Sequence, residues 1–442
     1  MSSAHDRSLL RFVPEPLALT LSLVVVVVAA GIVVHGDMRV VANAFAAGMF
    51  QPSQLAFAAQ MALVLTTGLA IAEAPPVQRV VAALARWPAR ADSAAVLVAA
   101  VTMGCALLNW GLGVVVGAVC AREVSLSLRA RGVANNPGVL GAAGFSGMAV
   151  WHGGLSGSAP LKVATSSSFS TEPIPIARTL GSVLNLATTT ALVITLIVVL
   201  ALLARRWRTN EPESAMRAAP PDVADDGDGR VGRVALGIVV GSILVVYAGR
   251  QLLQKGSDAV TLDWVLAAST GVGLLAHMSR GASSWGRAMT RGAAEAGAVL
   301  VHFPFYFGIS AVAVESGLVR MGAEAFASLA TVLPAAPQTT AALTTFFSAG
   351  LINLVVPSGG GQWAVQGPLI AESAAAMGVD SAPLVMAFAY GDQWTNLVQP
   401  FWALPLLSIT GLPARALLPA TTVCLLACGI VTTITLALFA SP

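Results

Sequence analysis

Long apolar segments alternate with short polar ones along the whole 442-residue chain. A helix needs about 20 apolar residues to cross the hydrocarbon core of a bilayer. Two segments, Gly138–Ala164 and Ala382–Thr410, are long enough but are interrupted by Gly, Ser, Asn and Pro, which predicts spanning helices that break inside the membrane. Seven less interrupted segments are predicted to be spanning helices: Leu17–Val34, Leu55–Ile71, Leu180–Leu203, Val234–Arg250, Thr261–His277, Ala293–Val314 and Ala416–Ala440.

Two other apolar stretches have a polar, glycine-rich centre. Residues 94–120 are centred on Asn109–Gly113, and residues 339–376 on Asn353 and Pro357–Gly361. The first stretch is too short for two crossings at 1.5 Å per residue and too interrupted for one. Each is predicted to be a re-entrant hairpin that enters the membrane, turns at its polar tip and returns to the same side.

The composition supports a membrane protein. Only 10% of the residues are charged and the mean hydropathy is +0.79, whereas a soluble domain carries about 25% charge. The first apolar run is too long for a cleavable signal and is predicted to be retained as a span. The predicted fold class is an all-α polytopic membrane protein, with nine spans, two re-entrant hairpins and broken helices.

One polar segment, residues 205–232, divides the chain into a first membrane repeat (1–204) and a second (233–442). Cytoplasmic loops of membrane proteins are enriched in Lys and Arg. With the N-terminus and this linker in the cytoplasm, 18 of the 24 basic residues lie inside. The six predicted to lie outside are Arg39, Lys162, Arg178, Arg250, Lys255 and Arg320.

The same topology gives the two halves one order of elements: two spans, a hairpin, a broken span and a span. The first half begins inside and the second, after one extra span, begins outside. Inverted repeats with broken helices are a hallmark of secondary transporters. The sequence therefore predicts two inverted repeats.

The hairpin tips and the helix breaks, predicted at Gly153–Pro160 and Gly391–Asn396, are the predicted binding site. Half-helix N-termini attract carboxylates, and unwound carbonyls and hydroxyls suit a hard cation such as sodium. The alternative is that the glycines serve close helix packing. Asp392, Asn353 and Thr395 are predicted to hold or border a coupling ion. The predicted substrate-binding residues are Asn109, Gly111, Gly113, Ser156, Gly157, Ser158, Ser358, Gly359, Gly360 and Asn396.

Four ionisable residues at membrane depth allow two interpretations each. Asp392 is costly in a membrane unless it is used or paired, so it fits a coupling role better than a structural carboxylate. Lys162 could bind an anion, but the interpretation that its side chain reaches to the outer interface fits better. His152 and His302 could relay protons, but the interpretation of each as a buried histidine with satisfied hydrogen bonds fits better.

Several function classes lack support. The chain has no nucleophile elbow, no phosphate loop and no zinc motif, and Gly359–Gly361 is followed by no Lys-Ser/Thr pair. The four cysteines lie in apolar segments and are interpreted as small buried residues. No basic run suggests nucleic acid. We therefore predict neither an enzyme nor a protein with a cofactor or metal site.

The motifs resemble those of the AtoE-type short-chain fatty acid transporters. That resemblance implies bacterial inner-membrane uptake of acids such as butyrate or acetoacetate. The family is similar in plan to the ion-transporter superfamily, whose members often work as homodimers with a moving transport domain. Lys162, His152 and His302 depart from the residues that the resemblance leads us to expect. The matching strings are Asn109–Ala118, Gly154–Leu161, Val356–Trp363, Gln366–Pro368, Ala389–Trp394 and Gln399–Pro405.

The predicted function is secondary active transport of a short-chain fatty acid or similar small monocarboxylate, coupled to sodium ions or protons. The absence of an ATP motif favours an ion gradient as the driving force. A channel, or a transporter of another small solute, is the alternative, because paired half-helices with asparagine tips also occur in pores.

Overall fold

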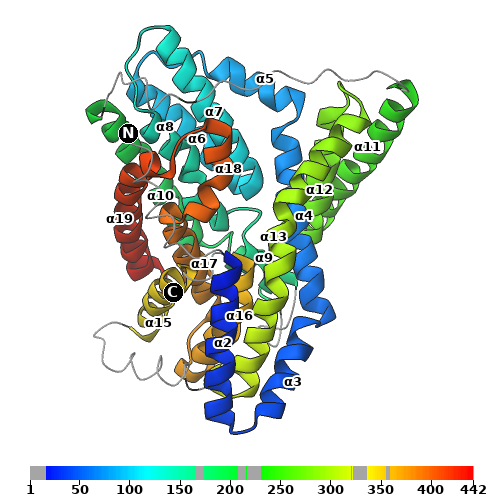
Figure 1. Cartoon of the computed structure of the whole chain (residues 1–442), viewed down its shortest axis with the longest axis vertical. Coiled ribbons are helices and arrows are strands. Elements are labelled where there is room, and N and C mark those ends of the chain that lie inside the picture. Colours follow the sequence, from blue (N-terminus) through cyan, green and yellow to red (C-terminus); the bar gives the residue numbers. More distant parts are fainter. Residues whose placement is uncertain are drawn as a thin grey trace, which may run out of the picture.

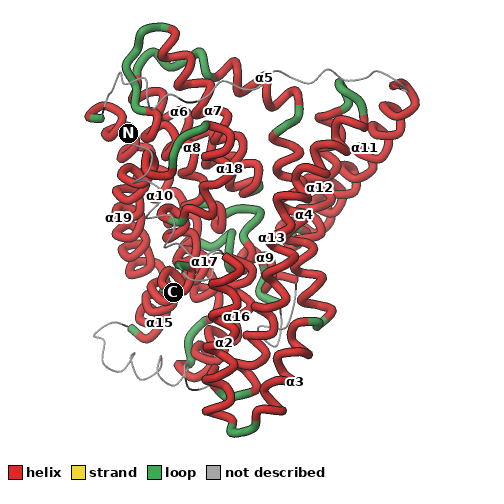
Figure 2. The backbone as a smooth tube through the Cα atoms, in the orientation of Figure 1, coloured by secondary structure: helices red, strands yellow, loops and turns green. Residues whose placement is uncertain are grey.

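The computed structural model describes residues 16–165, 173–207, 216, 230–319, 321, 336–354 and 359–441. Within these ranges every regular element is a helix (Figure 1), and short loops join the helices (Figure 2). Six helices are long and apolar enough to cross a membrane, or seven if α13 (Ala282–Glu315), bent by 42° near its middle, counts as one span. The prediction of an all-α polytopic membrane protein is confirmed.

Local sequence explains where many helices begin. Proline at the first position of a helix has the required φ and lacks an N–H that would have no partner there. Asparagine, serine and aspartate side chains also cap helices: Asn136 accepts from Val139 N, and Ser182 from Asn185 N. Proline occupies the first turn of α4 (Pro52–Ala72), α5 (Pro75–Leu84), α8 (Pro137–Phe145), α15 (Pro337–Asn353) and α18 (Pro400–Thr410).

One group of helices gathers around the long helix α13 and is called the α13 group. Its contacts are close: Gly31 faces Val312, Gly48 faces Ala311, and Thr20 Oγ1 lies 3.0 Å from Tyr306 Oη. The helices α4 and α13 lie side by side in Figure 1. Besides α13, the group comprises α2 (Pro16–His35), α3 (Met38–Met49), α4, α11 (Arg230–Lys255) and α12 (Leu262–His277).

The other helices, apart from the short α5, form the α17 group. Its first hairpin is antiparallel, because Gly113 faces Ala106 and Gly117 faces Thr102 at distances that exclude a Cβ. The group comprises α6 (Ala91–Leu108), α7 (Trp110–Ala130), α8, α9 (Ser158–Thr165), α10 (Val183–Arg206), α15, α16 (Gly359–Met377), α17 (Ser381–Thr395), α18 and α19 (Ala414–Phe439).

The first hairpin is longer than predicted. Its two helices cover residues 91–108 and 110–130, and each is long and apolar enough to cross a membrane. The argument that residues 94–120 are too short for two crossings was therefore wrong, because polar residues at the ends of both helices were excluded from the count. Re-entrance of this hairpin stays a prediction, as does the inverted relation between the halves. The second hairpin, α15 and α16, lies within two residues of the predicted stretch 339–376, and residues 355–358 of its tip lie outside the described residues.

The two predicted helix breaks differ. The existence of the first is confirmed, but it covers residues 146–157 and begins earlier than predicted: α8 gives way to 3₁₀ turns and an extended residue before α9 begins at Ser158. The second was placed at Gly391–Asn396, but α17 stays helical to Thr395 and the break covers Asn396–Gln399. Pro400 sets the break, because the residue before a proline avoids helical geometry and Gln399 is extended. Asp392 consequently lies in the last turn of α17.

Polar contacts between loops agree with the predicted sidedness. Arg205 on α10 binds Asp92 (2.6 Å), and Arg291 binds Glu73; all four residues are predicted to lie inside. Arg178 binds Asp380 (2.8 Å), and both are predicted to lie outside. No pair among these joins the two predicted sides.

Labelling of introduced cysteines tests the orientation. Most of the linker, residues 208–215 and 217–229, lies outside the described residues. We expect a cysteine at Ser214 to resist an impermeant thiol reagent in intact cells and to react after the membrane is opened. A cysteine at the exposed Ser257, on the opposite side, should react in intact cells. Ready labelling of the linker in intact cells would reverse the orientation.

Candidate functional site

The first hairpin tip and the first helix break lie against each other. Ser156 Oγ accepts a hydrogen bond from Trp110 N (2.9 Å), and Leu155 N donates to Leu107 O (2.7 Å). Asn109 accepts from Leu112 N and donates to Val64 O on α4. These bonds fix the tip of the hairpin to the break and to the α13 group.

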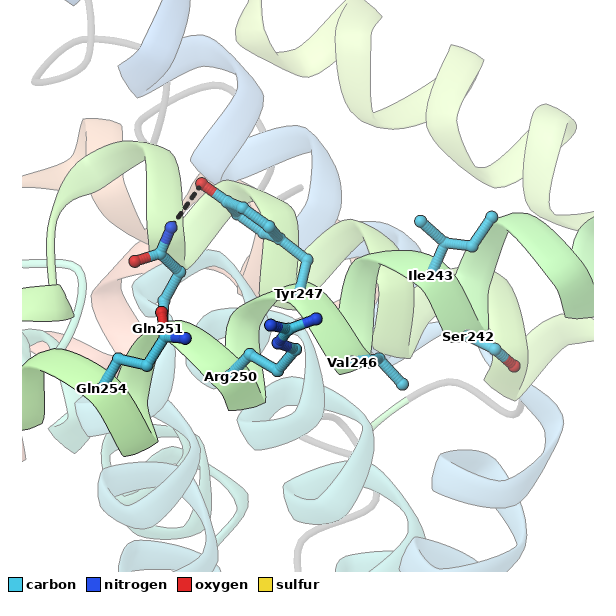
Figure 3. A pocket seen from close by; sticks show the side chains of 7 residues that line it. All are labelled: Ser242, Ile243, Val246, Tyr247, Arg250, Gln251 and Gln254. Atoms are coloured by element: carbon cyan, nitrogen blue, oxygen red, sulfur yellow. Dashed lines mark hydrogen bonds between the residues drawn. The ribbon is translucent and has the colours of Figure 1, made fainter.

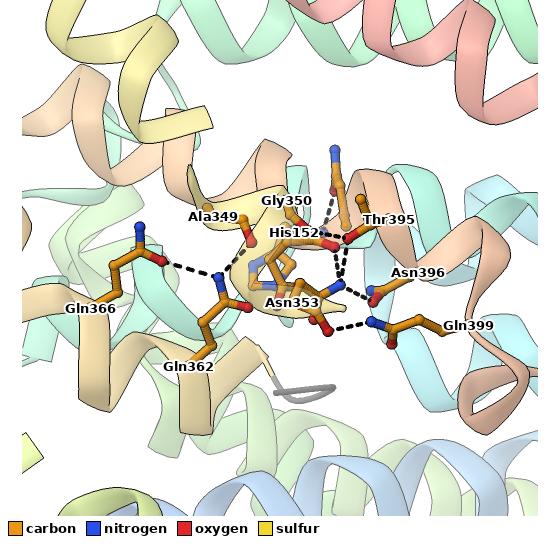
Figure 4. A network of polar contacts seen from close by, with 11 residues as sticks. His152, Ala349, Gly350, Asn353, Gln362, Gln366, Thr395, Asn396 and Gln399 are labelled. Carbon is orange, nitrogen blue, oxygen red and sulfur yellow. Dashed lines mark hydrogen bonds and ion pairs between the residues drawn. The ribbon is translucent and has the colours of Figure 1, made fainter. Parts of the chain in front are cut away.

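The second tip and the second break meet in the same way (Figure 4). Asn353 ends α15, and its Nδ2 lies 2.7 Å from Asp392 O, 2.9 Å from Thr395 Oγ1 and 2.7 Å from Asn396 Oδ1. Gln399 Nε2 donates to Asn353 O. Three oxygens thus surround a nitrogen that carries only two hydrogens.

A buried pair joins the first helix break to the last turn of α17. His152 Nε2 lies 2.8 Å from Asp392 Oδ2, and the two side chains are 0% and 1% exposed. This contact needs a proton on one of these two atoms. His152 N also donates to Gln393 Oε1 (3.0 Å), so residues about 240 positions apart form one network.

Polar atoms without partners concentrate in this network. A buried polar atom that lacks a hydrogen bond costs about 1–3 kcal/mol, and such atoms in a native protein often mark a place for water, an ion or a ligand. Within the described part of the chain, the unpartnered atoms here are His152 Nδ1, Ser158 Oγ, Asn353 Oδ1, Gln362 Oε1, Asp392 Oδ1, Gln393 Nε2, Asn396 Nδ2 and Gln399 Oε1.

The first turn of α16 closes over the network. A Cβ at Gly359 would lie 2.6 Å from His152 Nε2 and 3.0 Å from Ser158 Oγ. A Cβ at Gly360 would lie 2.9 Å from Phe303. The glycines therefore let the start of α16 approach polar side chains on one side and an aromatic ring on the other.

The structure separates the predicted site residues into two sets. Ser158, Gly359 and the residues around Asn353 line the network with unpartnered atoms, whereas Gly360 faces the Phe303 ring. Asn109 and Ser156 instead use their polar side chains to hold the first tip. The remaining glycines serve close packing: Gly111 faces Leu65, Gly113 faces Ala106, and Gly157 faces His152 O. Ser358 lies outside the described residues.

Sequence reasoning left His152, Gln393 and Gln362 out of the site. His152 was interpreted as a histidine with satisfied hydrogen bonds, yet its Nδ1 has no partner in the described structure. Its position just before Gly153 and Gly154, in a break predicted to bind ligand, was the available signal. Nothing in the sequence pairs it with Asp392.

A separate groove of about 550 Å³ lies along one face of α11 (Figure 3). Its lining among described residues comes from α11 alone: Ser242, Ile243, Val246, Tyr247, Arg250, Gln251 and Gln254. Ile243, Val246 and Tyr247 are exposed, as expected for a helix that faces lipid. The groove has no contact with the buried network.

Comparison with known proteins agrees with this architecture. The profile of the family described as "Short chain fatty acid transporter" matches residues 1–218 and 227–439. An Escherichia coli (strain K12) protein named "Putative short-chain fatty acid transporter" is 33% identical, over 99% of both chains. A Haemophilus influenzae protein of the same name is 32% identical, over 92% of both. The crystal structure of the Alcanivorax borkumensis YdaH transporter aligns with a TM-score of 0.59 at 15% identity, over 96% of this chain and 98% of that one, and thus shares the fold.

The apolar helices and these family matches identify a multi-pass membrane transporter rather than an enzyme. The chain belongs to the short-chain fatty acid transporter family. The predicted family resemblance is confirmed.

Proposed function

We propose that the protein is a secondary active transporter of short-chain fatty acids or similar small monocarboxylates in the bacterial inner membrane. The observation that carries this proposal is the meeting of two hairpin tips and two helix breaks in one buried network with unpartnered polar atoms. Broken helices around a central site are the usual construction of such carriers. The names of the family and of both relatives support the substrate class.

A coupling cation follows from the charge of the site. A carboxylate deep in a membrane costs about 3 kcal/mol or more without compensation, and Asp392 is almost fully buried. The substrate is also an anion, so its entry adds a second negative charge. A bound sodium ion or proton would reduce that repulsion and would itself bind better with substrate present.

The oxygens around Asn353 are the best candidates for a sodium site. Asn353 Oδ1 has no partner, whereas Nδ2 lies within 2.9 Å of three oxygens. Rotation of this amide by 180° would bring a fourth oxygen to the same place. Oxygen ligands suit a hard cation, so Asn353, Thr395, Asn396 and the Asp392 carbonyl form the proposed ion site.

Uptake by proteoliposomes tests this function. Vesicles with purified protein should take up labelled butyrate or acetoacetate saturably, and above the external concentration, when an inward sodium or proton gradient is imposed. Neutral short acids cross lipid unaided, so the assay runs at alkaline pH beside protein-free vesicles. Applying each gradient alone identifies the coupling ion.

Two outcomes would contradict the proposal. Uptake that rises linearly with concentration and stops at equilibrium under every gradient would indicate a channel. Saturable accumulation of a neutral solute, with no response to monocarboxylates, would indicate a carrier of another substrate.

A further inference from the structure

Lys162 lies at the boundary between the α13 group and the α17 group. It is half-buried on α9, and its Nζ lies 4.6 Å from the centre of the Phe57 ring on α4. Within the described part of the chain no carboxylate forms an ion pair with it. A half-buried ammonium whose neighbour is a ring face favours the arrival of an anion.

A second observation points to the same place. Ser158, one turn before Lys162 on α9, is fully buried, and its Oγ has no hydrogen-bond partner within the described structure. That hydroxyl lies 3.0 Å from the Cβ position of Gly359, in the first turn of α16. The N-terminus of a helix carries partial positive charge. An ammonium on the same helix, a hydroxyl donor and a helix N-terminus thus occur together.

An apolar wall adjoins these polar groups. Phe57 and Phe303 have ring centres 6.2 Å apart, and the Cβ position of Gly360 lies 3.3 Å from Phe57 and 2.9 Å from Phe303. The same Phe57 ring therefore faces both Lys162 and the start of α16. A carboxylate at the polar groups would direct a short alkyl tail along these rings.

We propose that Lys162 and Ser158 bind the substrate carboxylate at the first turn of α16, and that Phe57 and Phe303 form the wall for its alkyl tail. This assignment rests on the proposed function and names the contacts that select a short monocarboxylate. It places the substrate between the two helix groups, where a movement of one group against the other would expose it.

Binding to purified protein tests the charged contact. Calorimetry should show that the wild-type protein binds butyrate better than butyramide. Because hydrogen bonds to charged groups contribute about 1.5–3 kcal/mol, Lys162→Gln should weaken butyrate binding about 10- to 100-fold and abolish the preference over butyramide. Lys162→Arg should retain part of that preference. Lys255→Gln, which changes the exposed lysine at the end of α11, is the control.

Chain-length preference tests the wall. Each methylene that gains a buried position favours binding about fourfold, so Phe57→Ala should shift the preference from butyrate toward hexanoate. Phe50→Ala, at an exposed phenylalanine, is the matched control. Size-exclusion chromatography of each variant confirms that it is folded.

The outcomes separate this assignment from the proposed function. Butyrate binding by Lys162→Gln equal to that of the wild type, with an unchanged preference over butyramide, would overturn the assignment alone. An unchanged chain-length preference in Phe57→Ala would overturn the wall. A wild-type protein that binds no monocarboxylate would overturn both the assignment and the proposed function.

Discussion

Replacement of Asp392 by asparagine is expected to reduce strongly the gradient-driven accumulation of substrate and to leave the exchange of substrate across the membrane intact. Asparagine has nearly the same shape as aspartate and can still meet His152 Nε2, now 2.8 Å from Asp392 Oδ2. It has no negative charge to attract a cation. Coupling free energies between sites are typically 1–3 kcal/mol, so gradient-driven accumulation should fall about tenfold or more.

Two assays on the same vesicles measure this difference. Gradient-driven uptake reports coupling, and counterflow of labelled against unlabelled butyrate reports binding and movement without a gradient. Asp258→Asn, at an exposed aspartate, should leave both unchanged. If Asp392→Asn concentrates butyrate as well as the parent, Asp392 has a structural role and the coupling ion binds elsewhere.

The helices could largely be predicted because lipid imposes a simple rule on sequence. An apolar run of sufficient length must be a helix, and polar glycine-rich interruptions must be breaks that contact protein or water. The helices α3 and α5 were missed because 12 and 10 residues are too few for that rule. The second break was misplaced because Gly391 suggested an unwound chain. In the structure this glycine instead lets α17 approach Phe346 O on α15.

The pairing within the site could not be predicted. Hydrophobic patterns place residues at a depth but give no register between helices that are far apart in sequence. His152 and Asp392 are 240 positions apart, and Tyr390 Oη donates to Asn185 across 205 positions. Lys162 was interpreted as a lysine that reaches to the outer interface, because no periodicity indicates the Phe57 ring beneath its ammonium.

Replacement of His152 by alanine is expected to have the largest effect on stability. If the pair is charged, removal of one partner costs about 3–5 kcal/mol, because the other charge stays buried without compensation. The unfolding temperature of the purified protein should therefore fall well below that of His35→Ala, which changes an exposed histidine. Butyrate uptake should be lost as well.

The double variant His152→Ala/Asp392→Asn decides the origin of that loss. If a buried charge is the cause, neutralising Asp392 should raise the unfolding temperature of His152→Ala back toward that of the parent. If Asp392 is instead protonated when paired, removal of the imidazole leaves an unpartnered neutral group, which costs only about 1–3 kcal/mol. Asp392→Asn then does not raise the unfolding temperature of His152→Ala.

The result bears on how substrate and cation communicate. His152 Nε2 lies 2.8 Å from Asp392 Oδ2 and 2.6 Å from the Cβ position of Gly359, where α16 begins. The imidazole thus stands between Asp392 and the proposed carboxylate site at Ser158 and Lys162. If the pair is charged, His152 is the group through which a cation near Asp392 favours binding of the substrate carboxylate at Ser158 and Lys162. Recovery of stability in the double variant supports coupling through His152. If stability is not recovered, the cation acts at the oxygens around Asn353.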